Sequence, residues 1–153
     1  MNTGYISLGS NINRKKNIFR AASMLDEQFE ECGFSSVYRT KPVGLKEQED
    51  FFNAIIVVRT QKTFGEVKKM LREIENALGR KRGPIKSGPR TIDLDLLVWN
   101  KKQSDEDAGK EYNLHGLKDV FEQWGLPFAL EKKVLAHKKI RPVPLNLGAR
   151  KPV

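Results

Sequence analysis

The sequence predicts an α+β domain whose elements follow the order strand, helix, strand, strand, helix, strand. Three observations predict this order: a long apolar run at Phe51–Thr60, two amphipathic helical patterns at Lys15–Glu30 and Thr63–Leu78, and a β-rich segment at Ile92–Trp99. This is the order of the split βαβ, or ferredoxin-like, fold. We therefore expect a ferredoxin-like βαββαβ core in a three-layer α/β/α arrangement, with an irregular C-terminal extension.

The first half of the predicted core begins with a short alternating strand at Tyr5–Gly9, followed by turn residues at Ser10 and Asn11. The helix over Lys15–Glu30 carries an apolar stripe at helical spacing. Phe34–Arg39 is predicted to be the second strand. Thr40–Asp50 is polar, and we expect it to be a loop long enough to close over a ligand.

The second half of the core has clearer boundaries. Thr63 and Glu66 form the pattern of a capping box, and Gly79 is placed to end the helix. The loop Arg80–Pro89 contains two Gly-Pro pairs and leads into the strand Ile92–Trp99.

The segment after Asn100 has weaker patterns. We expect Lys101–Glu111 to be an exposed loop, Leu114–Trp124 a short helix, and Arg141–Pro152, which carries three prolines, extended or irregular. The expected organisation is a single domain over residues 1–153, with a core at 1–100 and an extension at 101–153.

The composition is typical of a globular domain, with 39% hydrophobic and 31% charged residues among 153. No apolar run approaches the roughly 20 residues of a membrane span, and the N-terminus lacks the pattern of a signal peptide. Cys32 is the single cysteine, so an intramolecular disulfide is excluded and a buried thiol in a reducing cytoplasm is expected. We expect a cytoplasmic monomer with no membrane partner.

The net charge of +9 favours anionic partners, either nucleic acid or a polyphosphate such as ATP. The stretch Arg80–Arg90 contains five basic and no acidic residues and directly precedes the strand at Ile92–Trp99. A second basic cluster lies between Lys132 and Lys151 and is compatible with a solvated surface.

Asp93 and Asp95 are two residues apart on a predicted strand, so both side chains leave the same face of the sheet. Two such carboxylates repel each other unless a cation lies between them, and Mg²⁺ takes one or two carboxylates together with substrate phosphates. Arg90 at the start of the strand could bind phosphate oxygens bidentately. The pattern favours phosphoryl-transfer chemistry, although aspartates at a sheet edge can also simply face water.

Asn53 is the one amide within the apolar strand Phe51–Thr60. A buried amide needs hydrogen-bond partners. Asn53 therefore either bonds nearby backbone or is directed at the hydrogen-bonding edge of a ligand.

The chain resembles the 6-hydroxymethyl-7,8-dihydropterin pyrophosphokinase family of the folate pathway. The resemblance covers roughly Tyr5 to Trp99, and Glu75 followed by Gly79, Arg80 and Arg82 also matches. Four sequence blocks carry it: Tyr5-Ile-Ser-Leu-Gly-Ser-Asn11, Tyr38-Arg-Thr40 with Pro42 and Gly44, Phe51-Phe-Asn-Ala54, and Gly88-Pro-Arg-Thr-Ile-Asp-Leu-Asp95.

The resemblance implies an ATP-dependent enzyme that transfers pyrophosphate to the hydroxymethyl group of a pterin and releases AMP. It implies that Asp93 and Asp95 hold two Mg²⁺ ions. The residues implied for phosphate or nucleotide contact are Glu75, Arg80, Arg82, Arg90, Leu96 and His115, of which the arginines, the aspartates and His115 are the candidate catalytic set. The residues implied for pterin binding are Thr40, Pro42, Val43, Phe51, Asn53, Phe121 and Trp124.

The chain also departs from the family pattern. The family commonly has tryptophan just before Gly-Pro-Arg, where this chain has Ser87, and a Pro-His pair where this chain has Leu114-His115. Phe121 and Trp124 are alternative candidates for the second aromatic face of the pterin site.

Two other classes of protein stay open at this stage. One is a diverged or inactive relative that keeps the ATP and metal site but serves another alcohol. The other is a ferredoxin-like nucleic-acid-binding module, which would need Tyr5, Phe51 and Phe52 on an exposed sheet face. The sequence has no RNP signature, so we expect no nucleic-acid partner.

Overall fold

The computed structural model describes residues 1–44, 47–80 and 91–147. Its strands and helices follow one another as predicted for the core, except that two short strands replace the single one predicted over Phe34–Arg39, and further elements follow after residue 100. They are β1 (Asn2–Ser10), α1 (Arg14–Gln28), β2 (Glu31–Phe34), β3 (Tyr38–Thr40), β4 (Phe51–Thr60), α2 (Phe64–Ala77), β5 (Asp93–Trp99), β6 (Lys102–Gln103), the short 3₁₀ helix η1 (Glu106–Gly109), α3 (Glu111–Val120) and α4 (Phe128–Ala136).

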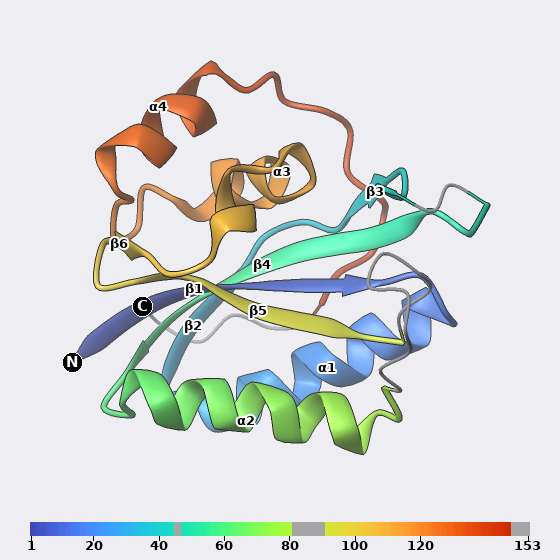
Figure 1. The fold of residues 1–153 in the computed structure, drawn as a ribbon, viewed down its shortest axis with the longest axis horizontal. Coiled ribbons are helices and arrows are strands. Elements are labelled where there is room, and N and C mark those ends of the chain that lie inside the picture. Colours follow the sequence, from blue (N-terminus) through green and yellow to red (C-terminus); the bar gives the residue numbers. More distant parts are fainter. Residues whose placement is uncertain (45–46, 81–90, 148–153) are drawn as a thin grey trace.

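The strands form one antiparallel sheet in the order β2-β4-β1-β5-β6, with β3 also paired to β4 (Figure 1). β1 is central, between β4 and β5. This antiparallel order with a central first strand is the ferredoxin-like topology, which confirms the predicted fold class.

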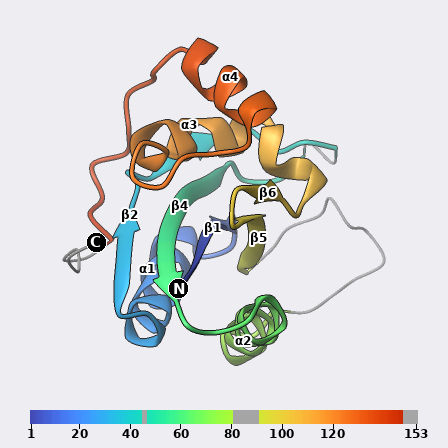
Figure 2. The same cartoon turned by 90° about the vertical axis from the view of Figure 1, so that its left-hand side faces the viewer.

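The sheet separates two helical layers (Figures 1 and 2). α1 and α2 cover one face, where even-numbered side chains of β4 such as Ile56 pack with Ile18 and Leu71. α3 and α4 cover the other face, where Ile55 packs with Leu117. The predicted three-layer arrangement is therefore confirmed, and the second layer comes from the segment whose sequence pattern was weakest.

The helix boundaries follow the local signals. Thr63 and Glu66 form the predicted capping box at the start of α2, with each side chain accepting a hydrogen bond from the other residue's backbone N–H. Gly79 lies just past the end of α2 with φ of 83°, a conformation that glycine adopts without strain. Helix α1 ends at Gln28, two residues earlier than predicted.

The prediction of one strand over Phe34–Arg39 was wrong. Two short strands, β2 and β3, pair with different parts of β4, and residues 35–37 between them belong to neither. Ser35 explains the break, because its hydroxyl accepts a hydrogen bond from the Ile55 amide at 2.8 Å and donates to the Ser36 carbonyl at 2.7 Å. Side-chain bonds of this kind compete with regular ladder pairing.

The prediction of an exposed loop over Lys101–Glu111 was also wrong. β6, η1 and the first residue of α3 lie in this range, and Ala108 is fully buried. The predicted helix at Leu114–Trp124 exists but runs from Glu111 to Val120, and α4 was not predicted. Residues 141–147 are irregular as predicted, with one isolated bridge between Val143 and Val37.

The aromatic residues that a nucleic-acid-binding sheet would need are buried. Tyr5 is 2% exposed beneath α3, and its hydroxyl donates to the Phe121 carbonyl. Phe51 and Phe52 are each 9% exposed. Cys32 is fully buried, as predicted. Within the described residues, none of the helices is long and apolar enough to cross a membrane.

The close packing of α3 on the sheet gives a stability prediction. A Cβ at Gly116 would lie 2.6 Å from Ile55 Cγ1, so Gly116→Ala should destabilise the protein by about 1–3 kcal/mol. Gly65 lies in α2 with no atom within 4 Å of such a Cβ, so Gly65→Ala should instead stabilise by about 0.5–1 kcal/mol. Urea unfolding measures the change in the free energy of unfolding for each variant. A change of the same sign and size in both would contradict the close packing of α3 on the sheet.

Candidate active site

The site lies on the sheet face that α3 and α4 only partly cover. Side chains alternate along β5, so Leu94 and Leu96 enter the core beneath α1 and α2 while Asp93 and Asp95 point to the opposite face. Asn53 lies on that same face, because its neighbour in the alternation, Ile55, packs under α3. In the sheet register, Gly9 of β1 lies opposite both Asn53 and Asp93.

One cavity of about 290 Å³ opens between the start of β4 and the start of β5. We call it the β4-side cavity. Loop residues after β3, the first residues of β4, the two aspartates and the η1–α3 segment form its walls. Its lining residues are Gly9, Thr40, Lys41, Val43, Phe51, Asn53, Asp93, Asp95, Asp107, Lys110 and Tyr112.

A second cavity of about 200 Å³ lies between α2 and β5. We call it the α2-side cavity. β6 pairs with Val98 and Trp99, at the far end of β5 from this cavity. The residues that line the α2-side cavity are Lys68, Leu71, Arg72, Glu75, Arg80, Asp93, Leu94, Asp95, Leu96 and Asp105. Asp93 and Asp95 are the residues that the two cavities share.

A partly buried ion-pair network holds the first aspartate in place. Glu75 is 4% exposed near the end of α2, and its Oε2 accepts a hydrogen bond from the Leu94 amide at 2.9 Å. The Arg80 guanidinium donates to the same carboxylate and to Asp93 Oδ1, at 2.8 Å from the latter. Removing one member of this partly buried network would leave a neighbouring charge uncompensated. The network therefore fixes the start of β5 against α2.

The second aspartate is electrostatically unfavourable as an anion. Burial raises the pKa of Asp95 to about 7, and the nearby carboxylates of Asp93, Asp105 and Glu75 add to this effect. The Arg80 guanidinium opposes it without cancelling it. In the metal-free protein Asp95 is therefore partly protonated near neutral pH, and a divalent cation would favour its ionised form.

The donor set fits Mg²⁺ rather than a metal held only by protein. Within the part of the chain that the structure describes, there is no cluster of three or more His, Cys, Asp or Glu side chains arranged to hold a metal ion. Asp93 and Asp95 instead face shared cavities with space beside them. Mg²⁺ is commonly bound by one or two carboxylates, with water and substrate phosphates completing its six ligands.

The wall of the β4-side cavity opposite the aspartates contains an amide held by a hydrogen bond and an aromatic ring. The Thr40 hydroxyl donates to Asn53 Oδ1, which fixes the orientation of the amide. A Cβ at Gly9 would lie 3.0 Å from Asn53 Nδ2, so the absence of a side chain at Gly9 leaves room for the amide in the cavity. Phe51 lines the same wall. This wall combines an apolar ring with an oriented amide.

Most of the predicted site residues that the structure describes lie around these two cavities. Thr40, Val43, Phe51 and Asn53 line the β4-side cavity, with Pro42 between two lining residues, and Glu75, Arg80 and Leu96 line the α2-side cavity. Arg82, Ser87 and Arg90 lie outside the described residues.

Three predicted residues lie elsewhere among the described residues. His115 is 8% exposed in α3, with its ring centroid 5.4 Å from that of Tyr38 and its Nδ1 2.7 Å from His137 Nε2. Burial, together with His137, lowers the pKa of His115. Phe121 is buried in the core under α3 and α4, and the Trp124 ring centroid lies 5.7 Å from the Arg59 guanidinium. None of the three is among the residues that line the two cavities.

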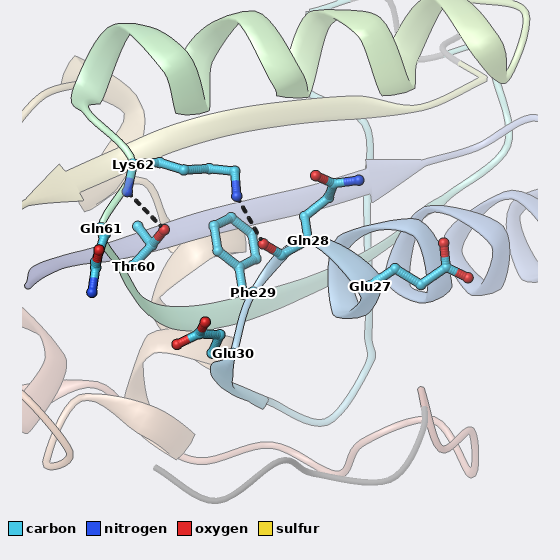
Figure 3. A pocket seen from close by; sticks show the side chains of 7 residues that line it. All are labelled: Glu27, Gln28, Phe29, Glu30, Thr60, Gln61 and Lys62. Carbon is cyan, nitrogen blue, oxygen red and sulfur yellow. Dashed lines mark hydrogen bonds between the residues drawn. The ribbon is translucent and has the colours of Figure 1, made fainter.

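A larger hollow of about 410 Å³ lies at the other end of β4, between Thr60 and the end of α1 (Figure 3). Its polar groups bond one another: Lys62 Nζ donates to the Gln28 carbonyl at 3.1 Å, and the Lys62 amide donates to Thr60 Oγ1 at 3.0 Å. It contains none of the predicted site residues, so the site is assigned to the two cavities at Asp93 and Asp95.

Comparison with known sequences identifies the family. The sequence pattern of 7,8-dihydro-6-hydroxymethylpterin-pyrophosphokinase (HPPK) matches residues 5–140. The chain belongs to the HPPK family.

Named HPPK relatives cover much of this chain. It is 38% identical over 104 residues to the 2-amino-4-hydroxy-6-hydroxymethyldihydropteridine pyrophosphokinase of Bacillus subtilis, covering 66% of this chain and 62% of that protein. It is 33% identical over 120 residues to the Haemophilus influenzae protein of the same name, covering 75% and 74%. An Arabidopsis thaliana mitochondrial folate synthesis bifunctional protein is 38% identical over 104 residues, which are 67% of this chain and 19% of that one. The match to the B. subtilis protein therefore spans about three fifths of that relative's length.

The structure places further residues around the two cavities that the sequence interpretation missed. Lys68 and Arg72 of α2 line the α2-side cavity with Glu75, and their spacing of four and three residues places all three on one helix face. That spacing was a signal available in the sequence. Asp107, Lys110 and Tyr112 line the β4-side cavity, but they lie in or beside a segment predicted to be an exposed loop, so no sequence pattern indicated them.

The pKa of Asp95 gives a pH-dependent prediction for the metal-free protein. Because the folded-state pKa is raised, the protein is most stable while Asp95 is protonated and loses stability as pH rises from about 4 through about 7. Asp95→Asn stays neutral, so its stability advantage over the wild type in EDTA should grow by about 1–3 kcal/mol between pH 5 and pH 8. Urea unfolding measures this difference.

Saturating Mg²⁺ provides the control, because it should stabilise the wild type at pH 8 and not the Asp95→Asn variant to the same extent. A difference between the two proteins that is the same at pH 5 and pH 8 would contradict the electrostatic assignment.

Proposed function

We propose that the chain transfers pyrophosphate from ATP to the hydroxymethyl group of 6-hydroxymethyl-7,8-dihydropterin. The observation that carries this proposal is the pair of cavities that share Asp93 and Asp95. A transfer between two substrates requires both to be held on either side of the same reacting centre. Membership of the HPPK family supports the same reaction.

The α2-side cavity suits the nucleotide. Lys68, Arg72 and Arg80 provide cationic groups for phosphate oxygens, and Leu71 and Leu96 provide apolar surface. We assign Glu75 to orienting Arg80, with which it is paired, and to the wall of this cavity. By the family resemblance, Arg82 and Arg90 are further phosphate ligands.

The β4-side cavity suits a small flat heterocycle. Its volume of about 290 Å³ is close to the lower end of the range for small-molecule sites. The Phe51 ring offers apolar contact, while the amide of Asn53 and the backbone around Thr40, Pro42 and Val43 offer donors and acceptors for the edge of a pterin ring. These groups would orient the acceptor so that its hydroxymethyl group faces the aspartates.

We propose two Mg²⁺ ions held by Asp93 and Asp95 together with nucleotide phosphates. When bound, they would neutralise charge on the triphosphate and polarise it toward attack. In the reaction, the acceptor hydroxyl oxygen bonds to the β-phosphorus, the bond from that phosphorus to the oxygen bridging it to the α-phosphorus breaks, and AMP leaves as the hydroxyl proton is lost. The chain's own part is to hold both substrates in line and to place cationic groups where negative charge develops.

A second candidate function is pyrophosphoryl transfer to a different alcohol. The observation that favours it is the placement of His115, Phe121 and Trp124 away from both cavities. A pterin site that lacks a second stacking ring would lose about 1–3 kcal/mol per contact, with base stacking as the measure. That is enough to change acceptor preference.

The single-domain organisation, the monomeric state and the cytoplasmic location stay predictions. The buried, reduced thiol of Cys32 is compatible with a reducing compartment.

Product analysis tests the proposed function. The protein, MgATP and 6-hydroxymethyl-7,8-dihydropterin should yield AMP and the pterin pyrophosphate in equal amounts by mass spectrometry. Asp93→Asn and Asp95→Asn should each lower turnover by about 10²–10⁴-fold, because each removes a metal ligand. Asp26→Asn on α1, beneath the opposite face of the sheet, is the matched control and should retain activity.

A panel of other primary alcohols separates the two candidates. AMP formation with another alcohol but not with the pterin would establish the second candidate instead. Full turnover by either aspartate variant would contradict the metal assignment.

A further inference from the structure

The turn between β1 and α1 contacts segments that border both cavities. β1 lies between β4 and β5, and its Gly9 lies opposite Asn53 on one side and Asp93 on the other. Ser10 and Asn11 follow directly, with exposures of 0% and 5%. The two residues belong to the block Tyr5-Ile-Ser-Leu-Gly-Ser-Asn11 that carried the family resemblance. Neither is among the residues that line the β4-side and α2-side cavities.

Ser10 holds the chain that leads into the aspartate strand. Its hydroxyl donates to the Thr91 carbonyl at 2.6 Å, and the Ile12 carbonyl lies 3.2 Å from the same oxygen. Thr91 is two residues before Asp93, so this bond restrains the backbone immediately ahead of the two carboxylates.

Asn11 holds the other wall. Its Nδ2 donates to Gln48 Oε1 at 2.7 Å and to the Glu49 carbonyl at 3.0 Å. Arg14, the first residue of α1, donates from Nη1 to the Asp50 carbonyl at 2.7 Å. These are the last loop residues before Phe51, so the bonds restrain the backbone immediately ahead of the Phe51 and Asn53 wall.

These bonds are separate from the bonds that support the turn itself. The N-cap of α1 is Asn13, whose side chain makes no capping bond, and the Ile12 carbonyl is held by Asn17 Nδ2 at 2.6 Å. Two side-chain bonds of Asn11 lead to the loop before β4, and the shorter bond of Ser10 leads to Thr91, just ahead of β5. The conformation of the turn does not require the bonds of Asn11 to the loop before β4 or the bond of Ser10 to Thr91.

We propose that Ser10 and Asn11 are positioning residues. They set the distance between the wall of Phe51 and Asn53, which would hold the acceptor, and strand β5, whose aspartates would hold the metal. This inference rests on the proposed function. The two residues are adjacent in sequence and fully or nearly fully buried. They connect the two walls through three hydrogen bonds of 2.6–3.0 Å, and the neighbouring Arg14 adds a fourth. Their loss should weaken binding of the acceptor to the enzyme–nucleotide complex more than it weakens binding of the nucleotide alone.

The test compares Ser10→Ala and Asn11→Ala with the wild type. Each variant should raise the KM for the acceptor about 10-fold, which is the loss expected for one or two net hydrogen bonds, while the KM for MgATP changes less than threefold. Ser10→Cys, which keeps a weak donor of similar size, should recover part of the effect. Asn11→Asp, which keeps the shape but cannot donate to Gln48 or Glu49, should behave like Asn11→Ala.

Ser35→Ala is the matched control, because the Ser35 hydroxyl is also buried and bonded but contacts neither wall. It should lower stability without changing the acceptor KM. The inference is overturned if Ser10→Ala and Asn11→Ala likewise lower only stability, or if the two KM values rise together.

Hydrogen exchange provides a readout that does not depend on activity. Asn11→Ala should speed exchange at residues 47–52, and Ser10→Ala should speed it at residues 91–95. Faster exchange confined to residues 10–12 would overturn the inference. Absence of pyrophosphoryl transfer by the wild type would instead count against the proposed function alone.

Discussion

The repulsion between two carboxylates on one strand face is the constraint on which the rest of the site depends. Asp93 and Asp95 are close to each other and to Glu75 and Asp105, in surroundings that raise the pKa of Asp95 to about 7. One part of this charge is compensated within the protein, because Arg80 pairs with both Glu75 and Asp93. The repulsion at Asp95 is only partly offset by Arg80, and a bound cation would relieve it. Proteins commonly lose stability at sites where function requires an unfavourable arrangement of charges, and ligand binding then restores it.

The sheet turns this local constraint into a site for two substrates. β1 is central, so the strand that carries the aspartates and the strand that carries Phe51 and Asn53 lie on either side of it. Helix α2 borders the α2-side cavity, and α3 begins beside the β4-side cavity. In the β1–α1 turn, short side chains bond the backbone ahead of both walls. Among the described residues, the order of the strands therefore places the two walls beside each other.

The core of the site was predictable because strand alternation is strict. It placed Asp93 and Asp95 on one face of the predicted strand. The position of Asn53 relative to them came only from the pairing of β1 with β4 and β5. The placement of His115 was not predictable in this way. Its neighbour Gly116 allows α3 to approach Ile55 so closely that His115 is enclosed between Tyr38 and His137. A tertiary contact of this kind leaves no periodic signal in sequence. Lys68 and Arg72 could have been predicted as neighbours of Glu75, because their spacing in the sequence places all three on one face of the helix.

The most direct test of the account is a calorimetric titration with a non-hydrolysable ATP analogue, with and without Mg²⁺, followed by 6-hydroxymethylpterin. The central claim is that two substrates bind at once on either side of Asp93 and Asp95. The account predicts that the nucleotide binds more tightly with Mg²⁺ and that the pterin then binds to the loaded protein. Competition between the nucleotide and the pterin, or nucleotide binding that is indifferent to Mg²⁺, would contradict it.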